Sequence, residues 1–311
     1  MPKYNLTKIA TYPALGGLAE ADITSEMKED GYGATCKGVY TVEKIEPHRS
    51  YGRWANSAVT WNAETKIVPK NTVMVKMGGK WRKLSKMPGW TRYRNELDVY
   101  NALLDAYDEL FNTGTIGAIR KRLGESRKGI LQKIKVNYLP TSPTGREIPS
   151  QWLLNDFGHK SIKYFRDKNH DGRRNNGERI NAQFMHSSPH TEIWAGLGSA
   201  SQTALYYDVF SAVKDPAVRS NFRQRFNNAM LQHSHGCIHI FPNDIDEMVA
   251  KGYIKKSSIV EVHAYDQKSQ AALTVNRART MNFEVHFFPM DTHVVVYKTE
   301  RVRATNTRIT F

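Results

Sequence analysis

Segments in which apolar and polar residues alternate recur from the first third of this 311-residue chain almost to its end. Such alternation is typical of β-strands that bury one face. It is found at Gly33–Val42 and Ser258–Tyr265, and Thr72–Leu84 alternates around a Gly-Gly pair that is typical of a tight hairpin turn. Phe283–Pro289 and His293–Tyr297 resemble a second hairpin. We therefore expect a mainly β fold with a β-rich N-terminal third.

Two regions have helical spacing instead. Asn95–Phe111 places its large apolar residues on one face, and Ile116–Ile134 continues with many basic residues, which predicts a helical insertion at about 88–135. Ala217–Phe226 follows a proline and repeats apolar residues at helical intervals. This second insertion, about 190–231, could be a lid beside an active site or a purely structural element. The expected fold class is thus α+β.

Composition and charge limit the kind of partner. Apolar residues make up 40% of the chain and the mean hydropathy is −0.57, values that fit a globular protein with one large domain or two modest ones. The formal net charge of +15 implies an acidic or polyanionic partner, such as nucleic acid or the anionic polymers of a bacterial envelope. The N-terminus lacks the apolar core of a signal peptide, and no segment is apolar enough to span a bilayer.

The two cysteines, Cys36 and Cys237, are too few for a disulfide framework. We interpret Cys36 as a packing residue. Cys237 follows Ser234-His235-Gly236, and a nearby imidazole can lower a thiol pKa and so supply the nucleophilic thiolate. Gly236 lacks a Cβ, so a substrate can approach the backbone there closely. A structural cysteine in a turn is the alternative, but the polar neighbours favour a nucleophile.

The sequence Ser-His-Gly-Cys followed by an aliphatic residue resembles the signature of L,D-transpeptidase (YkuD-type) catalytic domains. In that family it reads Ser/Thr-His-Gly-Cys, an aliphatic residue, then Asn or Arg. Ile238 fits the fifth position, whereas His239 departs from the sixth, where it can still donate a hydrogen bond to substrate. Gly33–Val42 is similar to the family's Thr-Pro-x-Gly strand, and Ser142–Ile148 is a competing match. The resemblance implies an L,D-transpeptidase-like β-sandwich.

The resemblance also implies a general base from an upstream strand that ends in an aliphatic-His step. Asn181–Pro189 matches, which makes His186 the expected base and Ser187 the residue whose backbone carbonyl orients the imidazole. His190 is the alternative base or a substrate contact. The long separation between His186 and Cys237 accommodates the second insertion.

By this resemblance, Cys237 attacks a peptidoglycan stem-peptide carbonyl and expels the terminal D-amino acid. An amine or D-amino acid (transpeptidation or exchange) or water (L,D-carboxypeptidase activity) then resolves the acyl-enzyme. Backbone N–H groups of His235, Gly236 and Cys237 are the candidate oxyanion donors, and Ser234 is expected at the substrate. No cofactor is required for catalysis.

The expected partners are peptidoglycan stem peptides and anionic envelope polymers rather than nucleic acid. The protein would act in the periplasm or cell wall, reached by a non-classical export route or by delivery to another cell. A secreted antibacterial effector would add a secretion or immunity partner. The alternatives are another Cys/His hydrolase or amidase, and a catalytically idle cell-wall-binding module.

A second motif precedes the proposed base. The segment from residue 167 to 178 matches the twelve-position calcium-loop template, with a glycine at position six. Two arginines add positive charge, and the alternative is a solvated turn between two strands. If the loop binds calcium, the ion is structural. The expected ligands are Asp167, Asn169, Asp171, the carbonyl of Arg173, Asn175 and Glu178.

These patterns divide the chain into two parts. Residues 1–266 are expected to form the L,D-transpeptidase-like catalytic domain with its two insertions. Residues 267–311 lie beyond the resemblance and are expected to form a C-terminal β appendage or to add edge strands.

Overall fold

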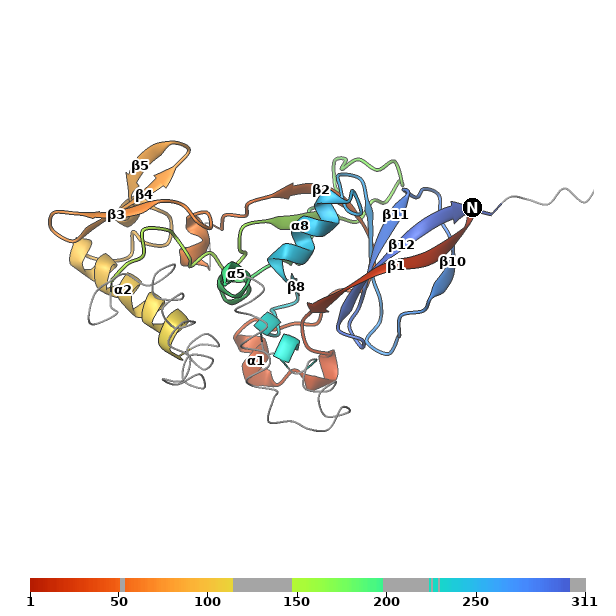
Figure 1. The fold of residues 1–311 in the computed structure, drawn as a ribbon, viewed down its shortest axis with the longest axis horizontal. Coiled ribbons are helices and arrows are strands. Elements are labelled where there is room, and N and C mark those ends of the chain that lie inside the picture. Colours follow the sequence, from red (N-terminus) through yellow and green to blue (C-terminus); the bar gives the residue numbers. More distant parts are fainter. Residues whose placement is uncertain (51–53, 114–146, 198–223, 225, 229, 303–311) are drawn as a thin grey trace, which may run out of the picture.

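The computed structural model describes residues 1–50, 54–113, 147–197, 224, 226–228 and 230–302. It is a mixed α/β structure in which strands predominate, and this confirms the expected α+β class. A large sheet and a three-stranded sheet lie at opposite ends of the molecule (Figure 1). The large sheet contains β1 (Lys3–Leu15), β2 (Gly38–Glu46), β6 (Ser161–Phe165), β7 (Met185–His186), β8 (Ile238–Ile240), β9 (Ile259–Val262), β10 (Ala272–Asn276), β11 (Phe283–Phe288) and β12 (His293–Arg301).

The nine strands follow the order β10-β1-β12-β11-β9-β2-β6-β7-β8. The end of β1 also pairs with β8, through Ala14 opposite Ile240 and Leu15 opposite His239, so the sheet closes on itself. Most neighbours are antiparallel, but β11 runs parallel to β9, and β7 runs parallel to β8. Apolar side chains from every strand except β10 form one core together with helix α8 (Pro242–Ala250).

Strands from the last part of the chain lie inside this sheet. β11 and β12 form the expected hairpin, but they lie between β1 and β9 rather than in a separate appendage or at an edge. Val285, Phe287 and Val294 are buried in the common core. The expectation of a separate appendage is therefore corrected for β11 and β12, whereas β10 (Ala272–Asn276) pairs with β1 at the edge of the sheet, as the alternative of added edge strands predicts. Alternation reveals that a strand buries one face, but it does not identify the partner strand.

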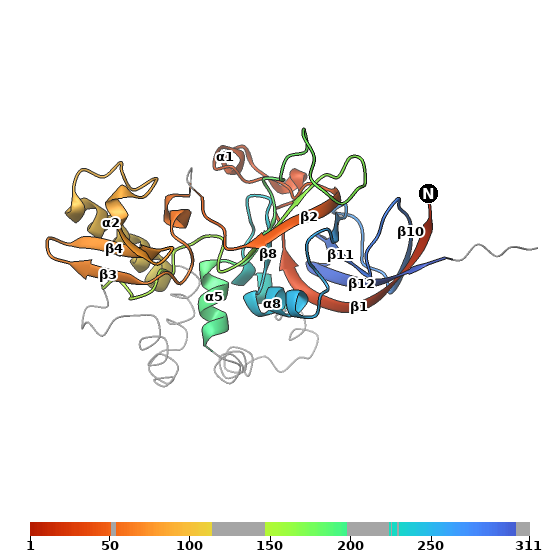
Figure 2. The ribbon, with the colours of Figure 1, turned by 90° about the horizontal axis from the view of Figure 1, so that it is seen from above.

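A second hydrophobic core lies under the small sheet of β3 (Thr65–Val68), β4 (Thr72–Met77) and β5 (Lys80–Lys83). The predicted hairpin between β4 and β5 is confirmed, with both turn glycines at positive φ. Helix α2 (Glu96–Asp108) packs on this unit and continues as a π-helical turn (Glu109–Thr113), as seen at the left of Figure 2. The helix expected at 116–134 lies outside the described residues.

The second insertion begins with α5 (Pro189–Gly196), whose N-cap Ser188 forms a capping box. Ile193 and Trp194 of α5 pack into the small unit's core together with Met230. The two described ends of the insertion, α5 and Met230, therefore pack on the core of the small sheet. The chain on either side of them belongs to β7 and β8 of the large sheet. Residues 198–223, which carry most of the expected lid, lie outside the description, so the lid remains a prediction.

The remaining short elements lie on connections between strands. They are η1 (Glu20–Asp22), α1 (Ser25–Glu29), η2 (Ala55–Ala58) and η3 (Leu84–Lys86).

No helix in the described ranges combines the length and apolar character needed to cross a membrane. Cys36, which we interpret from the sequence as a packing residue, is exposed, so this interpretation was wrong.

Candidate active site

Cys237 stands immediately before β8, where the loop from Ser234 enters the sheet. β7 and β8 run side by side, with His186 opposite His239, and the N–H of Ile238 donates to the carbonyl of Phe184. Side chains alternate along strands, so His239 is directed to the same face as His186, while Cys237 stands just before this pairing, next to Phe184. The structure thus brings the predicted nucleophile and base to adjacent strands.

The His186 ring is buried, and its Nδ1 lies 2.6 Å from the carbonyl oxygen of Ser187. This is the contact expected from the sequence. A carbonyl only accepts, so Nδ1 carries the hydrogen and Nε2 keeps its lone pair, the form that a general base needs. Burial, reinforced by the neighbouring His239, lowers the pKa of His186 well below 6.5, so the imidazole is neutral at pH 7.

Sγ of Cys237 lies 4.0 Å from the carbonyl oxygen of Ala182, and within the described ranges no hydrogen bond joins it to His186. Burial raises the thiol pKa to about 11, which the backbone N–H of Phe184 only partly offsets. Cys237 is therefore a neutral thiol at pH 7. Its activation requires proton transfer when substrate binds, because a thiol itself is a poor nucleophile.

Hydrogen bonds fix the loop before Cys237. The hydroxyl of Ser234 accepts the N–H of Gly236 at 3.0 Å and donates to the carbonyl of Cys237. Ser234 therefore shapes the loop, and its expected contact with substrate stays a prediction. The N–H of Gly236 is engaged by this hydroxyl, so its predicted oxyanion role is not supported here. The backbone N–H of Cys237 is a remaining candidate donor.

Gly236 has a φ of +110°, a conformation that L side chains rarely adopt. A Cβ at this position would lie 2.0 Å from Nε2 of Gln183. Gln183 in turn accepts the N–H of Cys36 at 2.7 Å and donates to the carbonyl of Ala34 at 2.9 Å. Gln183 thus links the loop before β2 to the nucleophile's loop, a role that sequence patterns did not indicate.

The other two histidines of the motif pack against rings. His235 stacks on Tyr32 at 4.2 Å between ring centroids and meets the edge of Trp54 at 5.0 Å. His239 lies 4.7 Å from His186 between ring centroids, and its Nδ1 contacts the carbonyl of Leu231 at 2.6 Å. The contact with Leu231 holds the His239 ring against the proposed base. His239 is therefore placed to position His186, although a substrate contact remains a prediction.

The rival base, His190, lies in the first turn of α5. Burial lowers its pKa to about 4, and its Nδ1 is buried with no hydrogen-bond partner among the described residues. The paired register of β7 and β8 includes His186 and not His190. The strand geometry therefore favours His186.

A network of hydrogen bonds between polar side chains holds Ser187 in place. The Ser187 hydroxyl donates to Glu192, which also accepts the backbone N–H of His159 at 2.8 Å and pairs with its ring. The other ring nitrogen of His159 lies 2.9 Å from Asp246 of α8. This network joins β7, α5 and α8 behind the carbonyl that orients His186. Its members are far apart in sequence, so no motif could identify them.

A cavity of about 300 Å³ opens beside Ala182, whose carbonyl oxygen lies 4.0 Å from Sγ of Cys237. Ala182, whose carbonyl contacts Cys237, lines it together with Tyr40 and three basic residues. Guanidinium and ammonium groups bind carboxylates through charge-assisted hydrogen bonds. Glu178 also lines the cavity, so the three basic residues leave an excess of positive charge, which suits an anionic ligand. The basic residues are Arg166, Lys168 and Arg179.

The predicted calcium loop lies between β6 and β7, and most of its oxygens accept hydrogen bonds within the loop. Asp167 accepts the N–H of Gly172 at 2.8 Å, and Glu178 accepts the N–H groups of Lys168 and Asn175. Oδ1 of Asp167 is the exception, because it is buried without a partner among the described residues. Calcium binding stays a prediction.

The other expected ligands of this loop also have partners in the structure. Asp171 accepts the N–H of Arg173 at 2.8 Å and the side-chain amides of Asn169 and Asn175. These hydrogen bonds from Asn175 and Arg173 lower the pKa of Asp171. The carboxylate is thus ionised and already satisfied by the loop.

No protein-family model, no curated protein and no solved structure matches this chain. The features of the site that bear on function are the thiol of Cys237, the oriented imidazole of His186 and the basic cavity that Ala182 lines.

Proposed function

We propose that this protein is a cysteine acyltransferase of the L,D-transpeptidase or L,D-carboxypeptidase type that acts on peptidoglycan stem peptides, with an L,D-transpeptidase-like fold. The observation that carries the proposal is that Cys237 directly precedes β8 while His186 lies in the neighbouring β7, with its Nδ1 held 2.6 Å from the Ser187 carbonyl. The sequence motif around Cys237 adds the substrate class.

In the proposed reaction, Nε2 of His186 takes the proton from Cys237, and the sulfur attacks the stem-peptide carbonyl carbon. The C–N bond to the terminal D-amino acid breaks, and His186 returns the proton to the departing amine. An amine or water then attacks the thioester and restores the thiol. The backbone N–H of Cys237 is a candidate donor to the developing oxyanion.

The charge of the cavity supports an anionic substrate. Arg166, Lys168 and Arg179 line the cavity together with Ala182, whose carbonyl oxygen lies 4.0 Å from Sγ of Cys237. Stem peptides carry free carboxylates, which these side chains can pair with. The net charge of +15 would also favour association with anionic envelope polymers. The proposed site of action is the periplasm or cell wall, with export or delivery to another cell as the route.

One observation favours a second candidate, a catalytically idle cell-wall-binding module. The pKa of the Cys237 thiol is raised to about 11, and Sγ contacts Ala182 rather than the base. A protein that only binds the wall would keep the basic cavity without needing a thiolate. This candidate predicts wall binding that is unaffected by loss of the thiol, with no chemical change in the wall.

Mass spectrometry of muropeptides after incubation with the protein separates the two candidates. The proposed enzyme removes a terminal D-amino acid, exchanges it or forms a cross-link, and Cys237→Ser abolishes these products while wall binding persists. Cys36→Ser is the matched control, because Cys36 is also free in the structure and should retain full activity. Unchanged muropeptides with wild-type protein over a range of pH, together with retained wall binding, would favour the binding module.

A further inference from the structure

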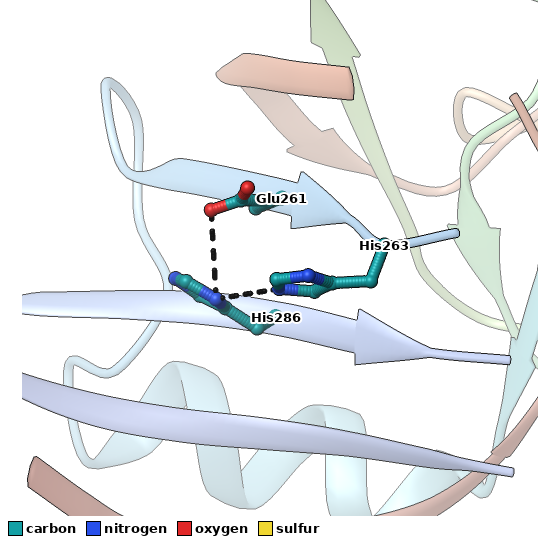
Figure 3. Close-up of side chains that lie close together, drawn as sticks. All are labelled: Glu261, His263 and His286. Carbon is teal, nitrogen blue, oxygen red and sulfur yellow. Dashed lines mark hydrogen bonds and ion pairs between the residues drawn. The ribbon is translucent and has the colours of Figure 1, made fainter. Parts of the chain in front are cut away.

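Two histidines and a glutamate converge on the opposite face of the large sheet from the core side chains of β9 and β11. Glu261 comes from β9, His286 from the neighbouring β11, and His263 lies just beyond the end of β9 (Figure 3). One ligand atom from each lies within 4.8 Å of the other two. The alternation along β9 and β11 directs Val260 and Val285 to the core instead.

Hydrogen bonds fix which nitrogen of each imidazole carries a proton. Nε2 of His286 lies 3.1 Å from Glu284, a carboxylate that also accepts from Arg277, so this nitrogen must donate. Nδ1 of His263 lies 3.2 Å from Oε1 of Gln267. That atom is an oxygen because it also accepts the N–H of Ala264, so Nδ1 of His263 donates as well.

The two remaining nitrogens therefore face each other with lone pairs. Nε2 of His263 and Nδ1 of His286 are 3.0 Å apart, and Oε2 of Glu261 lies 3.6 Å from the latter. Two lone pairs at this distance repel unless a positive charge lies between them. A metal ion or one extra proton can supply that charge.

The spacing suits a metal of the zinc class. Zinc bonds of about 2.0–2.1 Å in a tetrahedral site place ligand atoms about 3.4 Å apart. The separations of Nδ1 of His286 from Nε2 of His263 and from Oε2 of Glu261, 3.0 and 3.6 Å, lie on either side of this value. Two imidazoles and one carboxylate form a ligand set typical of zinc, cobalt or nickel, whereas calcium prefers oxygen ligands alone.

The surroundings have the features of a supported ligand set. Glu284 and Gln267 occupy the outer nitrogens of the two histidines, as the partners of metal-bound histidines commonly do. Phe288 stacks on His263 at 4.0 Å between ring centroids and restricts its rotation. Arg277 pairs with Oε2 of Glu261, the oxygen 3.6 Å from Nδ1 of His286, so Arg277 would hold this carboxylate in place beside an ion. Glu261 is 23% exposed, so an ion can enter from solvent.

We propose that Glu261, His263 and His286 bind one divalent transition-metal ion of the zinc class, with water completing the coordination. The site is separate from Cys237 and independent of the proposed acyl transfer. Its role is structural, because it joins the end of β9 to β11 at the start of the connection that carries Tyr265. The Tyr265 hydroxyl donates to the carbonyl of Gly17 at 2.8 Å.

Calorimetric titration of metal-free Cys237→Ser protein with zinc chloride tests the proposal, and the serine keeps the thiol from competing for metal. One equivalent should bind per chain. His263→Gln, in the same background, should weaken binding at least 10-fold, in line with the loss of a ligand or its supporting partner. The corresponding cobalt complex should show visible d–d absorption that disappears in the same variant.

His170→Asn is the matched control, because His170 is exposed, lies outside the cluster and has a positive φ that asparagine tolerates. It should bind zinc as the parent does. Glu261→Gln provides a second ligand variant if His263→Gln loses its native circular dichroism. The proposal would be overturned if the parent protein binds no zinc, or if the ligand variants bind zinc as tightly as the parent. A proton shared between the two imidazoles would then explain their close approach.

Discussion

Replacement of Gly236 by alanine should destabilise the protein and disturb the nucleophile's loop together. The φ of +110° costs a non-glycine residue roughly 1–3 kcal/mol. The added Cβ would also lie 2.0 Å from Gln183, so that side chain must move. Its two hydrogen bonds to the loop before β2 are worth about 0.5–1.5 kcal/mol each. The expected loss of unfolding free energy is roughly 2–6 kcal/mol.

Gly78→Ala is the matched control for the backbone part of this loss. Gly78 also has a positive φ, +58°, but a Cβ there would meet nothing within 4 Å. Its substitution should cost only about 1–2 kcal/mol, the usual penalty of an L residue in the left-handed region. Urea unfolding of the two variants and the wild type measures the difference, provided that the urea m-value is unchanged.

A double substitution separates the clash from the backbone strain. Gln183→Ala removes the atoms that the new Cβ would meet at Gly236, so the two changes should be less than additive in unfolding free energy. Thiol labelling of Cys237 should change in Gly236→Ala and not in Gly78→Ala. Equal destabilisation by the two glycine substitutions, or full additivity with Gln183→Ala, would refute the reasoning.

Three further outcomes are expected. His186→Ala should slow acylation roughly 10²–10⁴-fold and His190→Ala much less, so comparable losses in single-turnover assays would contradict the pairing. Because only thiolate reacts and the pKa of Cys237 is about 11, its labelling rate in Cys36→Ala protein should rise about tenfold per pH unit from pH 7 to 10, and a plateau near pH 8 would exclude that pKa. Calcium at about 10⁻⁴–10⁻³ M should raise the melting temperature if the 167–178 loop binds it, and an identical melting curve with chelator would assign the loop as a polar turn.

Local structure was predictable where neighbouring residues determine it. The turn at Gly78-Gly79 follows from residues that tolerate positive φ, and the start of α2 follows from the Asn95 cap, whose side chain accepts the N–H of Asp98 at 2.9 Å. The contact between His186 and the Ser187 carbonyl was also expected, since it joins adjacent residues.

Long-range placement was not predictable from these patterns. An alternating strand such as β11 specifies a buried face but no neighbour, so its place beside β9 came from the folded structure. The same holds for Gln183 and for the support of Ser187 by Glu192 and His159, which depend on segments far apart in the chain. The motif around Cys237 indicated chemistry but could not give the thiol pKa, because burial sets that value.

The position of β1 has a consequence for synthesis of the protein. β1 is translated well before its partners β10 and β12, and a side-chain hydrogen bond between Asn5 and Thr274 spans 269 positions. At 5–20 residues per second, the ribosome needs about 15–50 s to make that distance. During this time β1 has unpaired edges, which are prone to aggregation and are a natural target for a chaperone. Its pairing with β8 places the Cys237 strand in the sheet, so the candidate site is expected to mature late in folding.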